Sequence, residues 1–176
     1  IKKYDPLLVE VDKALNDSQK IEELLLTKPY VKKDQIGLIG WSWGGTSGMY
    51  AHKVSDRVPL PHGGFKGTIA FYPNLKYIID EPQWERTGPI TQPLLILYGK
   101  DDTLESEESY QELLEAGYPA KIKVVGLKGA VKKFDELGDA RTKYHPSVGH
   151  FEKAFNQDAF DKSVIEVNKF LLENFR

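Results

Sequence analysis

The fold of this chain is decided by the stretch Ile36-Gly37-Leu38-Ile39-Gly40-Trp41-Ser42-Trp43-Gly44-Gly45. Its first four residues form an apolar run after a polar lead-in, which predicts a fully buried parallel strand. The small residues that follow, 45–51, predict a helix that packs its backbone closely against the sheet. Between the two lies a Gly-x-Ser-x-Gly pattern, which is typical of a serine on a sharp turn between a strand and a helix.

The pattern around Ser42 has a catalytic and an ordinary interpretation. A serine hydroxyl is a weak nucleophile, so it needs a sharp turn, a general base and backbone N–H donors for an oxyanion. A helix that begins at Trp43 would point its N–H groups and the positive end of its dipole at Ser42. The ordinary interpretation is a turn in a Gly-rich loop. The strand before it and the helix after it favour the catalytic interpretation.

The composition predicts one globular domain. The 176 residues are 40% apolar and 11% aromatic, which is enough to bury a substantial core. A net charge of −2, spread without a basic stripe, argues against nucleic acid as a partner. No apolar run approaches the roughly 20 residues of a membrane span. The absence of cysteine excludes disulfides and thiolate chemistry and leaves the cellular compartment open.

Predicted strands and helices alternate along the chain. The first helix has Asp5 as its N-cap and Pro6 at its first helical position. The other predicted helices cover residues 44–54, 105–116 and 158–174, and the predicted strands cover residues 35–40, 67–72, 93–98 and 121–127. This order predicts an α/β fold with a mostly parallel sheet and helices on both faces. Residues 74–92 and 129–143 are expected to form long loops or short helices.

An acidic residue follows the third predicted strand. That strand runs into Gly99-Lys100-Asp101-Asp102, which puts two carboxylates at the carboxyl edge of the sheet, where Ser42 also lies. We choose Asp102 as the carboxylate that would orient an imidazole, because Gly-x-x-Asp a few residues before a helix is the spacing seen in serine hydrolases of α/β architecture. Asp101 is the reserve. The alternative is a solvated turn.

A histidine is expected beyond the last strand. His150 lies in residues 144–151, which we predict to be a loop before the terminal helix. An imidazole there would take the serine proton, and the carboxylate would fix its tautomer. His145 competes, but Pro146 beside it suggests the end of a strand. Each residue alone has an ordinary explanation; the chain order Ser42, Asp102, His150 favours a catalytic triad.

Together these stretches resemble the α/β-hydrolase superfamily and are most similar to the dienelactone hydrolase family. Residues 36–45 resemble its nucleophile elbow, 65–73 the next strand, 92–102 the strand that carries the acid, and 144–150 the histidine loop. The resemblance spans roughly Asp5 to Phe175. It implies a serine hydrolase that acts on carboxylic esters or lactones through an acyl-enzyme intermediate.

Two departures limit what the resemblance implies. The founding members use cysteine where this chain has Ser42, which argues against assuming a dienelactone substrate. Family members also have strands before the first helix seen here, and a loop after one of them supplies half of the oxyanion hole. We therefore expect residues 1–176 to be a single domain that lacks its N-terminal strands, with the N–H of Trp43 as one oxyanion donor.

The expected ligand is a small-molecule ester or lactone, with Trp41, Tyr72 and Trp84 lining its site. Packing is the alternative role for these aromatic residues. Four histidines without metal-ligand spacing, and no glycine loop that cradles phosphates, predict no metal and no other cofactor. The sequence leaves the oligomeric state open. Two alternatives remain, a peptidase of the prolyl oligopeptidase type and a non-catalytic binding module on a hydrolase scaffold.

Overall fold

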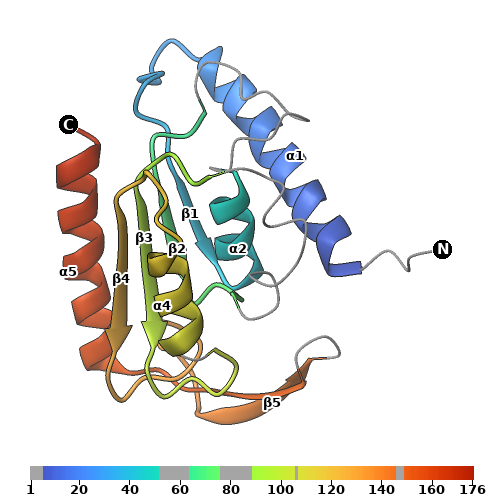
Figure 1. Cartoon of the computed structure of the whole chain (residues 1–176), viewed down its shortest axis with the longest axis vertical. Coiled ribbons are helices and arrows are strands. Elements are labelled where there is room, and N and C mark those ends of the chain that lie inside the picture. The colour runs from blue at the N-terminus through green and yellow to red at the C-terminus, as the bar shows by residue number, and fades with distance from the viewer. Residues whose placement is uncertain (1–5, 52–63, 76–88, 106, 146–148) are drawn as a thin grey trace.

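The computed structural model describes residues 6–51, 64–75, 89–105, 107–145 and 149–176 (Figure 1). Four strands form one sheet in the order β1-β2-β3-β4, and each neighbouring pair is parallel. Their bounds are β1 Leu38–Trp41, β2 Thr68–Phe71, β3 Leu94–Gly99 and β4 Ile122–Leu127. The four strands overlap the four predicted ones, but β1 is not the fully buried strand expected: it lies at the edge of the sheet, and Ile39 and Trp41 are 50% and 45% exposed.

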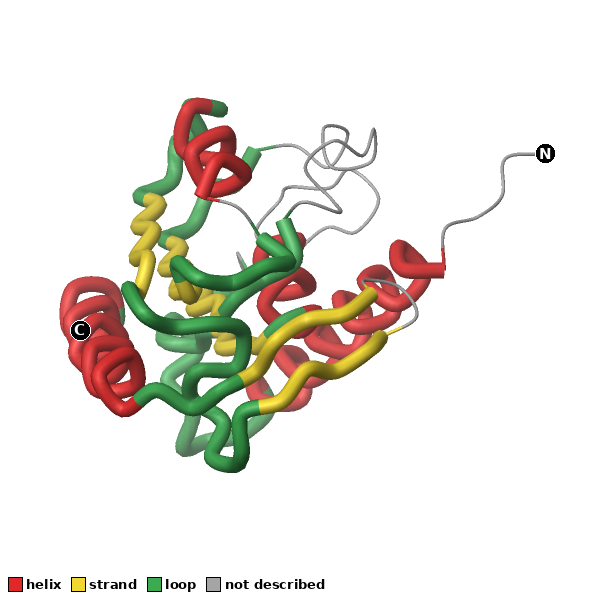
Figure 2. The backbone as a smooth tube through the Cα atoms, turned by 90° about the horizontal axis from the view of Figure 1, so that it is seen from below, coloured by secondary structure: helices red, strands yellow, loops and turns green. Residues whose placement is uncertain are grey.

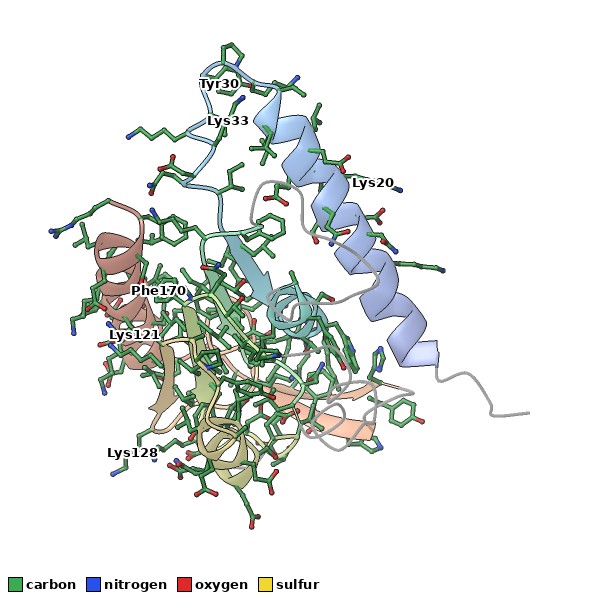
Figure 3. All side chains as sticks on the ribbon, turned by 45° about the horizontal axis from the view of Figure 1, so that its top comes forward. Lys20, Tyr30, Lys33, Lys121, Lys128 and Phe170 are labelled. Atoms are coloured by element: carbon green, nitrogen blue, oxygen red, sulfur yellow. The ribbon has the colours of Figure 1, made fainter. Side chains whose placement is uncertain are left out.

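Helices cover both faces of this sheet (Figure 1). Their bounds are α1 Pro6–Leu26, α2 Trp43–Tyr50, α4 Glu107–Glu115 and α5 Gln157–Asn174. Side chains of β3 alternate between the faces: Leu94 and Ile96 pack with α2 and α4, whereas Leu95 and Leu97 pack with α5. Figure 3 shows Phe170 of α5, which is buried on this second face. The prediction of helices on both faces of a parallel sheet is confirmed.

The first helix lies against α2 and extends away from the sheet (Figure 1). It begins at Pro6, as predicted, because a proline at the first helical position has no N–H to leave unpaired. Asp5, the predicted N-cap, is outside the described residues, as are residues 52–54 at the predicted end of α2. None of the described helices combines the length and the apolar composition that a bilayer crossing requires.

The region between β4 and α5 differs from the prediction. The predicted loop at residues 144–151 contains the ends of two strands: β5 (Arg141–His145) and β6 (Gly149–Lys153) pair as an antiparallel hairpin (Figure 2). Residues 146–148 lie outside the described residues. On β6, buried Phe151 and Lys153 alternate with exposed His150 and Glu152. The strands were missed because β5 is almost entirely polar, so no apolar run marks it.

Ion pairs anchor this hairpin to the segment that follows β4. The carboxylate of Glu136 accepts hydrogen bonds from Lys133 and from Lys153 of β6. The side chain of Lys153 is only 4% exposed, and its ammonium forms an ion pair with this carboxylate. A parallel bridge between Lys132 and Lys153 joins the two backbones at the same point.

Replacing Glu136 by glutamine tests this anchor. Hydrogen bonds from Lys133 and Lys153 lower the pKa of Glu136 from 4.5 to about 2. A lowered carboxyl pKa stabilises the fold above pH 4.5, and the contribution is lost as the pH falls through the folded value. We expect Glu136→Gln to lower the free energy of unfolding by less than about 1 kcal/mol at pH 7, with a smaller difference at pH 3.

Urea unfolding at pH 7, 5 and 3 measures this difference. The matched control is Glu152→Gln, which removes an exposed carboxylate from the same hairpin and should leave the free energy of unfolding at pH 7 unchanged. If Glu136→Gln changed the free energy of unfolding by the same amount at pH 7 and at pH 3, the ion-pair account would be wrong.

Candidate active site

Ser42 occupies the turn between β1 and α2. Its backbone has φ 54° and ψ −121°, a conformation in the left-handed region that is strained for any residue with a side chain. Its N–H donates to the carbonyl of Phe71 at 2.9 Å, and its own carbonyl accepts from Thr46 at 3.0 Å. The predicted sharp turn is therefore present, and Ser42 is half-buried at the N-terminus of α2.

This turn requires a glycine before the serine. A Cβ on Gly40 would collide with the backbone of Gly44 and Gly45, so the end of β1 and the start of α2 touch backbone to backbone. A Cβ on Gly44 would meet nothing within 4 Å. The two glycines of the Gly-x-Ser-x-Gly pattern thus have different roles, and only Gly40 is needed for the close approach.

Ser42 lies between two hollows at the carboxyl edge of the sheet. The first has a volume of about 300 Å³ and is lined by Ser42, Trp43, Asn74, Lys132, Lys133, Lys143, Tyr144, His145 and Phe151. The second has a volume of about 390 Å³ and is lined by Trp41, Ser42, Tyr72, Lys133, Asp135 and Glu136. Ser42 therefore borders both hollows.

Asp102 and Asp101 differ sharply in burial. Asp102 is 9% exposed, whereas Asp101 lies at the surface. One oxygen of Asp102, Oδ1, accepts from the N–H of Leu104 at 2.9 Å. Its Oδ2 is buried without a hydrogen-bond partner among the described residues. Burial raises the pKa of Asp102, and the N–H of Leu104 and the charge of Lys132 oppose the rise. This environment fits an acid that holds a base in place.

The two histidines of the hairpin lie on opposite faces of its strands. His150 is exposed, and its ring centroid is 5.1 Å from that of its cross-strand neighbour Tyr144. His145, the last residue of β5, lines the first hollow with Ser42. Because side chains alternate along a strand, His145 lies on the same face as Lys143. The cross-strand partner of Lys143 is Phe151, which is buried. The described structure thus brings His145 to the hollow and places His150 on the other face, and a triad with His150 stays a prediction.

The predicted aromatic residues have different surroundings. Trp41 stacks on Phe71 at 5.3 Å and donates to Asp135 at 2.6 Å, and Tyr72 donates to the same carboxylate at 2.8 Å. Burial and Asp135 raise the pKa of Tyr72, so this phenol stays a neutral donor. Both rings line the second hollow with Ser42. Trp84 lies outside the described residues.

Sequence reasoning missed Lys132 and Asp135, both of which line these hollows. They lie in the polar segment 129–143, where no periodic pattern predicts an element. A usable signal was their place directly after β4, because the segments after parallel strands gather at one edge of the sheet. Within the described part of the chain, no group of three or more His, Asp or Glu residues is arranged to hold a metal ion.

Alanine substitutions at the two glycines test the tight turn. Gly40→Ala forces two backbone segments apart, so we expect it to lower the free energy of unfolding by about 2–3 kcal/mol, in the range of overpacking mutations. Gly44→Ala is the matched control and should leave stability unchanged or slightly raised, since it puts a methyl into open space on a helix. Thermal and urea unfolding measure both. Equal effects at both positions would contradict the close contact between β1 and α2.

The fold is similar to that of solved structures of esterase 2 from the planctomycete Thermogutta terrifontis. The form phosphoramylated by tabun is 20% identical in sequence to this protein, with a TM-score of 0.65. The match covers 93% of this protein and 63% of the esterase chain. The form phosphonylated by cyclosarin is 19% identical with a TM-score of 0.68, and the match covers 93% of this protein and 63% of the esterase chain. The propionate-bound form is 18% identical with a TM-score of 0.64, and the match covers 93% of this protein and 64% of the esterase chain.

At these identities the likeness concerns the fold alone, and it confirms the predicted α/β-hydrolase fold. The chain spans less than two thirds of the length of these esterases. A search of curated proteins gave no significant match. The family model of the dienelactone hydrolase family matches residues 2–160, which is most of the chain. This protein therefore belongs to the dienelactone hydrolase family.

Proposed function

We propose that this protein is a serine hydrolase that cleaves small carboxylic esters or lactones through an acyl-enzyme intermediate. The observation that carries the proposal is the backbone of Ser42, held at φ 54° at the N-terminus of α2 and open to two hollows. Strained residues persist only where the surrounding structure holds them, and they cluster at functional sites. Family membership supports the same reaction class.

In the proposed reaction, Oγ of Ser42 attacks the carbonyl carbon of the ester. Negative charge then develops on the carbonyl oxygen, near the N-terminus of α2, where the N–H of Trp43 is the proposed donor. The two hollows beside Ser42 offer separate spaces for the acyl group and the alcohol. Release of the alcohol leaves an acyl-enzyme, which water hydrolyses.

Asp102 is the proposed acid of this site. It is buried, and its Oδ2 has no hydrogen-bond partner in the described part of the chain, which leaves a carboxylate oxygen for a donor. His150 is the base predicted from the sequence, and it can serve only if the hairpin turns its imidazole toward Ser42. His145 already lines the hollow. The reaction class and the role of Ser42 do not depend on which nitrogen takes the proton.

The proposed substrate is uncharged at the reacting carbonyl and small enough for hollows of about 300 and 390 Å³. Organophosphorus compounds are suitable probes, because esterase 2 of Thermogutta terrifontis, which shares the fold, has been captured phosphorylated by paraoxon. A fluorophosphonate would form a stable bond with Oγ of Ser42 by the same attack.

A fluorophosphonate probe tests the nucleophile. Applied to the full-length protein at pH 8, it should label wild type and leave Ser42→Ala unlabelled, with the labelled peptide containing residue 42 by mass spectrometry. The same samples should show a graded response to p-nitrophenyl esters of increasing acyl length, lost in Ser42→Ala. Equal labelling of both proteins would end the assignment and leave the binding-module alternative.

The strain at Ser42 gives a second prediction. Glycine adopts φ 54° at little cost, whereas alanine keeps the strain of roughly 1–3 kcal/mol. We expect Ser42→Gly to be more stable than Ser42→Ala by about 1 kcal/mol in urea unfolding, although glycine usually destabilises through its unfolded state. Both variants should be inactive. An alanine variant as stable as the glycine variant would contradict stored strain at this residue.

A further inference from the structure

The hairpin of β5 and β6 carries basic residues on one face. Because side chains alternate along a strand, Arg141, Lys143 and His145 of β5 share a face. The cross-strand partners of the first two are Lys153 and Phe151 of β6, which are both buried. These buried partners show that the face is turned toward the rest of the molecule, at the carboxyl ends of the parallel strands (Figure 1). An inward face that is basic in place of apolar needs an explanation other than core packing.

The first hollow beside Ser42 is lined by positive charge. Three lysines contribute to it, Lys132 and Lys133 after β4 and Lys143 of β5, together with His145. None of the described residues that line it is acidic. The chain as a whole has a net charge of −2, so this concentration of basic residues is local. A cleft lined by one sign of charge raises the local concentration of ligands of the opposite sign.

The protein neutralises only part of this charge by ion pairs. Lys133 and Lys153 share a single carboxylate, that of Glu136. Arg141 and Lys143 form no ion pair with any residue that the structure describes. Two positive charges of the hairpin face therefore have no paired carboxylate in this part of the chain.

Lys132 adds a buried charge at a fixed position. The residue is 3% exposed, and its Nζ donates to Oδ1 of Asn74 at 2.8 Å and to the carbonyl of Tyr72 at 3.3 Å. Burial, the largest influence, lowers the pKa of Lys132, whereas the charges of Asp102 and Glu105 raise it. A negative charge in the hollow would act in the same direction as these two carboxylates and stabilise the ammonium.

Like charges surround Lys143. The positive charge of Lys153 is the largest cause that lowers the pKa of Lys143, and burial, Arg141 and Lys133 act in the same direction. Glu136 opposes them. The basic neighbours disfavour the ammonium because like charges repel. A negatively charged ligand would offset this repulsion, so the half-buried Lys143 is suited to contact an anion.

We propose that the basic face of the hairpin and the first hollow bind a phosphate group of the substrate, and that the protein cleaves carboxylic esters of phosphorylated alcohols. The inference rests on the proposed hydrolase function and names the substrate class of that site. Lys143 is the main proposed contact, and Lys132 and Lys133 complete the positive lining. Ser42 borders the same hollow, so a bound phosphate would hold the ester near Oγ.

A phosphate suits this lining better than a carboxylate. A phosphate monoester carries a charge of about −1.5 to −2 at pH 7 and three acceptor oxygens, whereas a carboxylate carries one charge and two oxygens. Lysine binds phosphate as a point charge and needs no planar, bidentate partner. Three ammonium groups around one hollow match a dianion with three oxygens. The volume of about 300 Å³ leaves room for a small alcohol.

Binding is measured apart from catalysis, in the full-length protein with Ser42→Ala. Isothermal titration with phenyl phosphate at pH 8 should show binding, and titration with phenol should show none. Adding Lys143→Gln should raise the Kd for phenyl phosphate about 10-fold to 100-fold, because a charge-assisted hydrogen bond is lost. Lys143→Arg keeps the charge and should restore most of the affinity. The matched control is Lys128→Gln, at an exposed lysine outside the hollow (Figure 3).

Turnover gives a second measurement on the full-length protein. We expect wild type to cleave 4-acetoxyphenyl phosphate with a kcat/KM about 10-fold to 100-fold above that for 4-methoxyphenyl acetate, which has a similar leaving group without the charge. The advantage should lie mainly in KM and shrink at high salt. It should fall in Lys143→Gln and remain in Lys128→Gln. Thermal unfolding should show Lys143→Gln at least as stable as wild type, because the removed charge is repelled by its neighbours.

Three outcomes would overturn the inference. Equal affinity for phenyl phosphate with and without Lys143→Gln would show that this lysine makes no contact. A loss of the same size in Lys128→Gln would show an effect of net charge alone. A kcat/KM for 4-acetoxyphenylacetate as high as for the phosphate ester would make a carboxylate the ligand. Each is compatible with fluorophosphonate labelling of Ser42 in wild type; failure of that labelling would instead overturn the proposed function.

Discussion

The site depends on one close backbone contact, that between Gly40 at the end of β1 and Gly44 at the start of α2. Because these segments touch, the chain must reverse within the three residues between the two glycines, and Ser42 takes up the strained conformation that the reversal needs. The buried packing of α2 on β1 and β2 supplies the stability that offsets this strain. A nucleophile on a flexible loop would lack this fixed direction.

The parallel sheet then brings distant segments to the same edge. The turn after β1, the loop after β3 and the segment after β4 carry Ser42, Asp102 and Lys132, which lie far apart in the sequence. Their approach follows from the parallel pairing of the strands and from the close packing of Ala130 on the end of β3. This arrangement is why polar residues directly after a strand are informative in an α/β fold.

The sequence predicted the strands of the sheet well, because continuous apolar runs such as Leu94–Leu97 are buried on both faces. It also singled out Asp102 over Asp101, which the difference in burial supports. The hairpin could not be predicted from an apolar pattern, since ion pairs and pairing between polar strands hold it. The choice between His145 and His150 depends on which face of β5 and β6 points inward, and a shift of one residue in a strand reverses that face. Lys132 was hidden in a polar segment whose path is set by tertiary contacts.

The hairpin and the buried Lys132 border the same hollow. Phe151 and Lys143 of the hairpin line the hollow that contains Lys132, and Glu136 ties the hairpin to the segment that carries this lysine. Burial is the main influence that lowers the pKa of Lys132, and the charges of Asp102 and Glu105 act against it. Opening the hairpin would admit water to this lysine and weaken the desolvation that lowers its pKa. The position of the hairpin thus sets the surroundings of Lys132 and of Ser42, because both residues line the hollow that the hairpin borders.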